Sequence, residues 1–246
     1  MNSGKPEQEF QRDRRNKSVR WQVNLLFTFH LSITFCRYFE IRSLMEAYME
    51  TKRCIFVAVG GQGNLLASNL LGQAALSMGI PAVVSEIHGM AQRGGVVESA
   101  VLMGEVTSPI VSAGEADVLV SFEPLETLRI LGKCHKGTLV ITNVQPQPPY
   151  TVSVGQGVYP PVDEALAKIK SKVDKVIAFN GNELAAKAGN PLSLNMVMLG
   201  ALIGSGTIPV TAEVMKGIIS GNTKKAFLDS NLKAFDLGIE VAKKAK

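Results

Sequence analysis

Short apolar runs alternate with helical patterns along most of this chain. Residues 54–59 are apolar and rich in β-branched side chains, and the run is too short for a globular helix, so we predict a buried strand. A glycine turn follows, and then apolar residues recur at helical spacing, with Leu65 and Leu66 expected on the buried face. A second strand is predicted over residues 81–87. This order is typical of the start of a βαβ unit.

The same alternation continues to the end of the chain. Further strands are predicted over 95–103, 114–122, 137–143 and 173–179, and further helices over 125–131, 162–171, 183–188, 192–202, 211–219 and 224–244. Strands alternating with helices predict a three-layer α/β fold with a mostly parallel sheet.

Glycine and proline modify this picture at three places. Gly200, Gly204 and Gly206 should allow another helix to pack closely against the 192–202 helix. Gly238 should weaken the last helix by roughly 1 kcal/mol relative to alanine. Residues 144–161 hold five of the eleven prolines and should form an extended excursion outside the core.

Polar residues gather where the first two predicted strands end. A glycine turn brings backbone N–H groups to a helix N-terminus, where an anion or phosphate binds favourably. Ligands of open α/β sheets also bind at the carboxyl ends of strands. The candidate binding residues are Gly60, Gly61, Gln62, Gly63, Ser85, Glu86, His88, Gln92, Arg93, Gly94 and Gly95.

The glycine spacing matches a dinucleotide-binding fingerprint only in part. Gly61 and Gly63 supply the first two glycines, but Leu66 occupies the third position, where close helix–strand packing is needed. Glu86 lies rather far beyond Gly61 for the carboxylate that binds a ribose hydroxyl. A stand-alone dinucleotide-binding dehydrogenase and a non-catalytic anion-binding module stay as alternative functions.

Charge and cysteine content exclude other classes. The net charge is +5, but residues 1–44 carry eight Lys and Arg against four Asp and Glu, and the remaining residues carry eighteen against seventeen. The body is nearly neutral, so we expect no nucleic-acid partner. Cys36, Cys54 and Cys134 lack the spacing of zinc or iron–sulfur ligands, so we predict no metal site, with Cys54 a buried hydrophobe. No disulfide framework is indicated, which favours the cytoplasm.

Residues 1–44 form an extension ahead of a single predicted domain at 45–246. Residues 21–35 are apolar, but they fall short of the roughly 20 residues of a spanning helix, so we expect no membrane insertion. They alternate at a strand period, and no small-residue cleavage site follows. Two interpretations stay open: translation starts at Met45 or Met49, or the extension is poorly ordered.

Two motifs together resemble a known family. AVGGQGNLLAS, followed by SEIHGMAQRGGVV at 85–97, is similar to the gamma-type subunit of the 2-oxoacid:ferredoxin oxidoreductases, and most similar to the indolepyruvate branch. The resemblance runs from about Arg53 to the carboxyl terminus, and Val96 departs from it where a smaller residue is expected. It implies a fold like domain III of pyruvate-ferredoxin oxidoreductase. It also implies coenzyme A-dependent oxidative decarboxylation of aryl pyruvates to aryl acetyl-CoA, with a pyruvate or 2-ketoisovalerate preference as the alternative.

The resemblance also implies that the chemistry is divided between subunits. This chain lacks a Gly-Asp-Gly motif followed by an Asn pair, and it lacks a cysteine cluster. Thiamine diphosphate, Mg²⁺ and [4Fe–4S] clusters should therefore lie in a larger partner subunit, with coenzyme A as cosubstrate and ferredoxin as electron acceptor. This chain would be a required component that is inactive alone.

The roles of single residues in the polar cluster stay open. Arg93 either pairs with a phosphate of coenzyme A or an acidic partner loop, or forms an internal ion pair with Glu86. His88 is either a weak catalytic candidate that donates protons near the thiamine or a hydrogen-bonded loop histidine. The apolar 192–202 helix belongs either to a subunit interface or to the core.

Overall fold

The computed structural model describes residues 51–89, 95–106, 108–148, 152 and 154–245, so the predicted extension at 1–44 lies outside the described residues. The strands of this part form one sheet in the order β2-β3-β1-β4-β5-β6. They are β1 (Lys52–Val59), β2 (Ala82–His88), β3 (Val96–Met103), β4 (Ala116–Ser121), β5 (Cys134–Asn143) and β6 (Lys175–Phe179). Every predicted strand is present.

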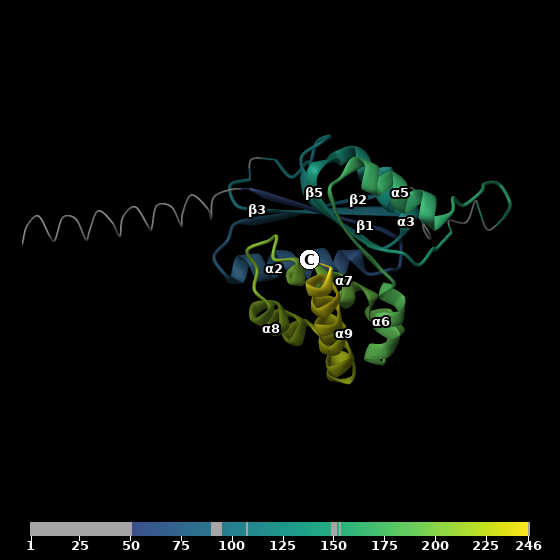
Figure 1. The fold of residues 1–246 in the computed structure, drawn as a ribbon. Coiled ribbons are helices and arrows are strands. Elements are labelled where there is room, and N and C mark those ends of the chain that lie inside the picture. Colours follow the sequence, from purple (N-terminus) through teal and green to yellow (C-terminus); the bar gives the residue numbers. More distant parts are fainter. Residues whose placement is uncertain (1–50, 90–94, 107, 149–151, 153, 246) are drawn as a thin grey trace, which may run out of the picture. The chain divides into compact units, whose positions relative to one another are not determined.

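Helices cover both faces of the sheet, which confirms the predicted three-layer α/β fold (Figure 1). On one face lie α2 (Asn64–Ser77), α6 (Gly181–Ala188), α7 (Leu194–Ser205), α8 (Ala212–Asn222) and α9 (Lys225–Lys244), and on the other lie α3 (Pro124–Ile130) and α5 (Val162–Lys172). The single-turn helices η1 (Leu131–Lys133) and η2 (Pro191–Ser193) complete the set within the described ranges. Alternate residues of β1 enter two separate cores, Phe56 on the α2 face and Ile55 on the α3 face. None of the helices in these ranges is both long and apolar enough to cross a bilayer.

Strand β3 enters the sheet between β1 and β2 and runs antiparallel to both. The predicted βαβ unit is present as β1, α2 and β2, but β3 lies between its two strands. Strands β1, β4, β5 and β6 are parallel neighbours. The connection between β2 and β3 is too short for a crossover, so β3 must return antiparallel. As a result β1 and β2 run in the same direction, and their carboxyl ends lie at the same edge.

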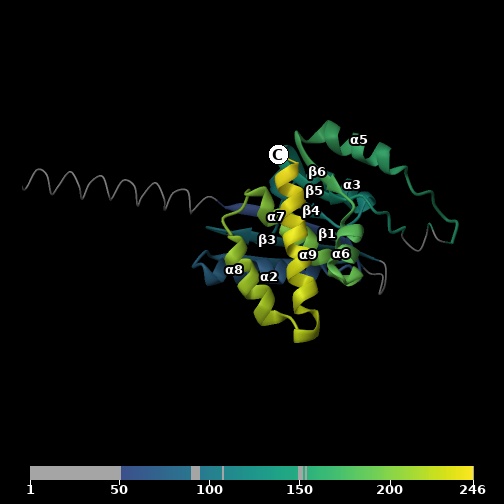
Figure 2. The same ribbon diagram turned by 60° about the horizontal axis from the view of Figure 1, so that its bottom comes forward.

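Helix α7 is the buried centre of the helical layer that contains α2. All of its residues are buried, and α9 lies across it (Figure 2). A Cβ at Gly200 would lie 2.0 Å from the Phe235 carbonyl oxygen, and one at Gly238 would lie 2.1 Å from that of Val197. Gly204 makes a similar close contact, whereas Gly206 ends α7 in the left-handed conformation. Residues 194–202 of the predicted helix are therefore core, and α9 is unbroken at Gly238.

The predicted buried face of α2 is wrong at Leu66. This side chain is 45% exposed, whereas Ala67 and Leu70 enter the core. The third position of the dinucleotide fingerprint therefore faces away from the sheet. Gly72 allows the close helix–strand approach instead, because a Cβ there would lie 2.6 Å from a methyl group of Val84.

Candidate functional site

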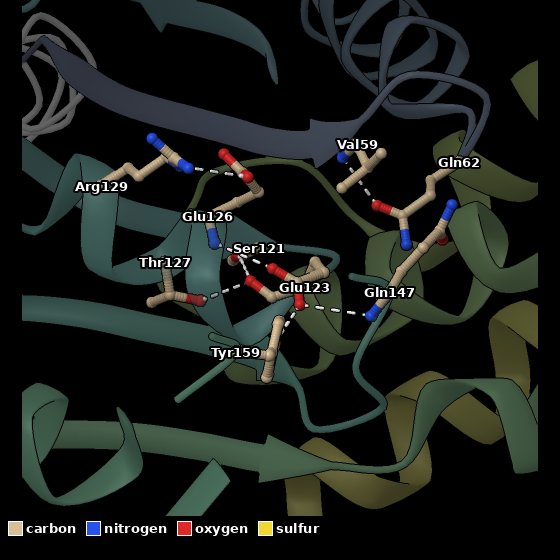
Figure 3. Close-up of polar contacts among 9 residues, drawn as sticks. All are labelled: Val59, Gln62, Ser121, Glu123, Glu126, Thr127, Arg129, Gln147 and Tyr159. Carbon is tan, nitrogen blue, oxygen red and sulfur yellow. Dashed lines mark hydrogen bonds and ion pairs between the residues drawn. The ribbon is translucent and has the colours of Figure 1, made fainter. Parts of the chain in front are cut away.

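The glycine turn after β1 is closed by the side chain of Gln62. Gly61 and Gly63 have φ values of 102° and 81°, in the left-handed region that other residues rarely adopt. Gln62 Oε1 accepts a hydrogen bond from the Val59 N–H at 2.8 Å (Figure 3). Gln62 Nε2 donates one to the Phe122 carbonyl at 3.2 Å. These two bonds fix the turn to the ends of both β1 and β4.

The turn leads directly into the N-terminus of α2. Gly63 precedes the helix, and no side chain of the described residues caps it. A Cβ on Gly63 would lie 2.7 Å from Asn195 Nδ2. Glycine is therefore needed here to make room for a side chain of the protein itself. In a dinucleotide fingerprint the second glycine instead admits the cofactor, so the geometry argues against that alternative. The first N–H groups of α2 are still of the kind that binds anions.

Gly95, which directly precedes β3, lies beside this turn. The Gly60 N–H donates to the Gly95 carbonyl at 2.9 Å, and the Gly89 N–H donates to the Val96 carbonyl at 2.9 Å. The structure thus brings Gly60 and Gly95 together at the carboxyl edge of β1. Gln92, Arg93 and Gly94, together with the side chain of His88, lie outside the described residues, and the roles suggested for them stay predictions.

Ser85 and Glu86 do not belong to one cluster. Ser85 Oγ donates to the Pro109 carbonyl at 3.0 Å, whereas Glu86 Oε1 accepts from Asn69 Nδ2 of α2 at 3.3 Å. Successive residues of a strand point to opposite faces, and β2 is regular through both positions. The two side chains therefore lie on opposite faces of β2, and a role for both at one binding edge stays a prediction.

A buried carboxylate that the sequence analysis did not include among the site residues lies just after β4. Glu123 has no exposed surface, and its Oε2 accepts from the Glu126 N–H at 3.0 Å, which caps α3. Its Oε1 accepts from the Gln147 N–H at 3.3 Å and from the Tyr159 hydroxyl (Figure 3). Three donors compensate for burial of the charge. A signal exists in the sequence, because Glu123 precedes Pro124 and stands three positions before Glu126, the spacing of a helix N-cap.

The neighbours of Glu123 share its buried surroundings. Burial, followed by the hydrogen bond to Glu123, raises the pKa of Tyr159 above its usual value, so the hydroxyl stays a donor at neutral pH. Burial is also the main cause that raises the pKa of Glu126, whose Oε1 lies 3.3 Å from Arg129 Nε. Glu126 Oε2 is buried and has no hydrogen-bond partner in the described part of the chain. The protein encloses this cluster, which suits a structural role.

Side-chain amides join the carboxyl ends of the other parallel strands. Asn143 ends β5, and its Nδ2 donates to the Phe122 carbonyl at 3.0 Å and to Asn182 Oδ1 at 2.9 Å. Its Oδ1 accepts from the Gly181 N–H at 2.9 Å. The Phe122 carbonyl thus receives donors from both Gln62 and Asn143. Side chains of the protein thus hydrogen-bond across the carboxyl ends of β1, β4 and β5, the edge at which an open α/β sheet usually binds its ligand.

Metal ligands are not assembled in the part of the chain that the structure describes, where no three His, Cys, Asp or Glu could hold an ion together. Cys54 and Cys134 are buried in different cores, as expected of small apolar side chains. Burial raises the pKa of both thiols, that of Cys134 to about 11, so neither presents a thiolate at neutral pH. These residues do not fit an iron–sulfur cluster or a thiamine-bound magnesium ion.

Comparison with known proteins confirms the family that the motifs resemble. Residues 53–241 match the family described as pyruvate ferredoxin/flavodoxin oxidoreductase. The chain is 42% identical to indolepyruvate oxidoreductase subunit IorB of Pyrococcus horikoshii over 79% of this chain and 98% of that relative. It is also 42% identical to the subunit of the same name in Methanothermobacter thermautotrophicus, over 75% and 94% of the two chains. The crystal structure of a keto/oxoacid ferredoxin oxidoreductase gamma subunit from Geobacter sulfurreducens aligns with a TM-score of 0.57 and 25% identity, covering 78% of this chain and 98% of that one. This chain belongs to the pyruvate ferredoxin/flavodoxin oxidoreductase family.

Proposed function

We propose that this chain is the smaller, non-thiamine subunit of an indolepyruvate:ferredoxin oxidoreductase in the cytoplasm. It supports the coenzyme A-dependent oxidative decarboxylation of aryl pyruvates to aryl acetyl-CoA. The observation that carries this proposal is the 42% identity to an indolepyruvate oxidoreductase subunit over 98% of that relative. The larger subunit supplies thiamine diphosphate, Mg²⁺ and [4Fe–4S] clusters, and ferredoxin accepts the electrons.

Exposed apolar residues around the glycine turn support docking at this edge of the sheet. Leu66, Ile87 and Leu192 are 45%, 59% and 84% exposed. Leu66 lies in the first turn of α2, Ile87 lies near the end of β2, and Leu192 precedes α7. Asn195 of α7 donates to the Gly63 carbonyl at 3.4 Å, which brings the start of α7 to the turn. Apolar side chains gathered at one edge are typical of protein interfaces, so we infer that the larger subunit covers this edge.

Reconstitution tests the proposed function. The purified chain should not reduce ferredoxin or a redox dye with any 2-oxoacid, because it carries none of the groups that perform the chemistry. Addition of the larger subunit should give activity with indolepyruvate and coenzyme A. A panel of phenylpyruvate, pyruvate and 2-ketoisovalerate would define the substrate preference. An isolated chain that decarboxylates an oxoacid, or a larger subunit that is fully active without this chain, would contradict the proposal.

We further propose that Arg93 and the first N–H groups of α2 bind a phosphate of coenzyme A. In the complex, Arg93→Ala should raise the KM for coenzyme A by roughly tenfold, the value of one charge-assisted contact, without lowering the yield of complex. Arg53→Ala, at the opposite edge of the sheet, is the matched control and should keep the wild-type KM. An unchanged KM for coenzyme A in Arg93→Ala would refute phosphate binding. An equal loss in Glu86→Ala would assign Arg93 to the internal ion pair instead.

A further inference from the structure

The segment that leads into α5 projects from the body of the domain. Residues 154–161, which we call the arm, loop outward beyond the start of α5 in both views (Figures 1 and 2). Val158 is 93% exposed, and Val154 is 44% exposed. The described part of the chain therefore leaves an almost fully exposed apolar side chain within a protruding segment.

The arm belongs to a connection that has no charged residues. Asp, Glu, Lys and Arg make up 19% of the chain, yet none occurs within residues 144–161. An exposed segment that only has to stay soluble usually carries charge, whereas the centre of a protein interface is depleted in charged residues. Pro160 and Pro161 restrict the backbone of the arm before any partner binds, which lowers the entropy lost on docking.

One buried carboxylate holds both ends of this connection. Glu123 Oε1 accepts hydrogen bonds from the Gln147 N–H and from the Tyr159 hydroxyl, and we call these three residues the latch. Glu123 is completely buried and also caps α3, so the latch fixes the base of the arm to the rigid part of the domain. The arm is thereby preorganised.

We infer that the arm docks onto the larger subunit of the complex, with Val158 entering an apolar, uncharged recess of that subunit. This inference rests on the proposed function. The latch adjoins the edge that the larger subunit is proposed to cover, because the carbonyl of Phe122, next to Glu123, accepts from Gln62 of the glycine turn. The arm adds Val154 and Val158 to the exposed apolar residues of the described chain, among them Leu66 and Leu192.

Measured affinity between the two subunits tests the arm. Val158→Asp places a charge in the proposed recess and should raise the dissociation constant for the larger subunit at least tenfold. Leu76→Asp is the matched control, because Leu76 is 58% exposed near the carboxyl end of α2, at the opposite edge of the sheet. It should bind within twofold of wild type. Thermal unfolding of both variants should match wild type, because both side chains are exposed.

The outcomes separate this inference from the proposed function. If the wild-type chain fails to bind the larger subunit, the proposed function is wrong and the inference falls with it. If wild type binds and Val158→Asp binds within twofold of it, the arm is not the docking element although the function stands. Sedimentation of the isolated chain tests whether the arm binds a second copy of this chain. A dimer that Val158→Asp dissociates would show that it does, and would contradict docking onto the larger subunit.

Discussion

Replacing Gly200 with alanine should lower the free energy of unfolding by about 3 kcal/mol, at the upper end of the usual cost of overpacking a core. The added Cβ would lie 2.0 Å from the Phe235 carbonyl oxygen and 2.9 Å from the carbonyl carbon. Both contacts are with backbone, so no change of rotamer relieves them, and α9 must move away from α7. Thermal unfolding should show a midpoint lower by roughly 6–12 °C, at about 2–4 °C per kcal/mol for a chain of this size.

Gly217→Ala in α8 is the matched control for this prediction. Nothing lies within 4 Å of a Cβ at Gly217, so the substitution changes helix propensity alone. It should raise the free energy of unfolding by about 0.5–1 kcal/mol, because alanine favours the helix. The two substitutions are chemically identical, and their opposite signs isolate the contact between α7 and α9. A Gly200→Ala protein with the wild-type midpoint would contradict that contact.

The helices and strands of this fold could be predicted from the sequence because the spacing and length of the apolar residues differ between the two kinds of element. The order of the sheet could not, since the apolar residues of β3 suit a parallel or an antiparallel neighbour equally well. The brevity of the β2–β3 connection is the signal for antiparallel return. Gly238 is a second example. Helix propensity alone predicts that glycine weakens α9 at this position. The structure shows why glycine is needed, because a side chain there would collide with the Val197 carbonyl.

The candidate site could be predicted where its residues lie at the ends of predicted strands. Gly60 and Gly95 meet because they flank neighbouring strands of the sheet. The side chains of Ser85 and Glu86 lie on opposite faces of β2, which could be predicted because adjacent residues of a strand point to opposite faces. The cluster around Glu123 could not be predicted in the same way, because Gln147 and Tyr159 belong to the proline-rich connection, where no strand or helix period fixes their position.

Glu123→Ala should lower the free energy of unfolding by about 3 kcal/mol. The substitution removes a helix cap, worth about 1 kcal/mol, and hydrogen bonds to a charged acceptor, each worth about 1.5–3 kcal/mol before the structure relaxes. It leaves the Tyr159 hydroxyl and the N–H groups of Glu126 and Gln147 without their acceptor. Glu240→Ala, at an exposed position of α9, is the control and should stay within about 0.5 kcal/mol of wild type in urea unfolding.

A double-mutant cycle then tests whether the latch is what holds the arm. Tyr159→Phe removes one hydroxyl and should cost about 1 kcal/mol in the wild-type background. In the Glu123→Ala background it should cost close to nothing, because the acceptor is already absent. Amide hydrogen exchange should become faster in residues 154–161 of both single variants, while the amides of β4 and β5 keep their order of protection. Equal costs of Tyr159→Phe in the two backgrounds would mean that the hydroxyl does not depend on Glu123, and the arm would then need a different anchor.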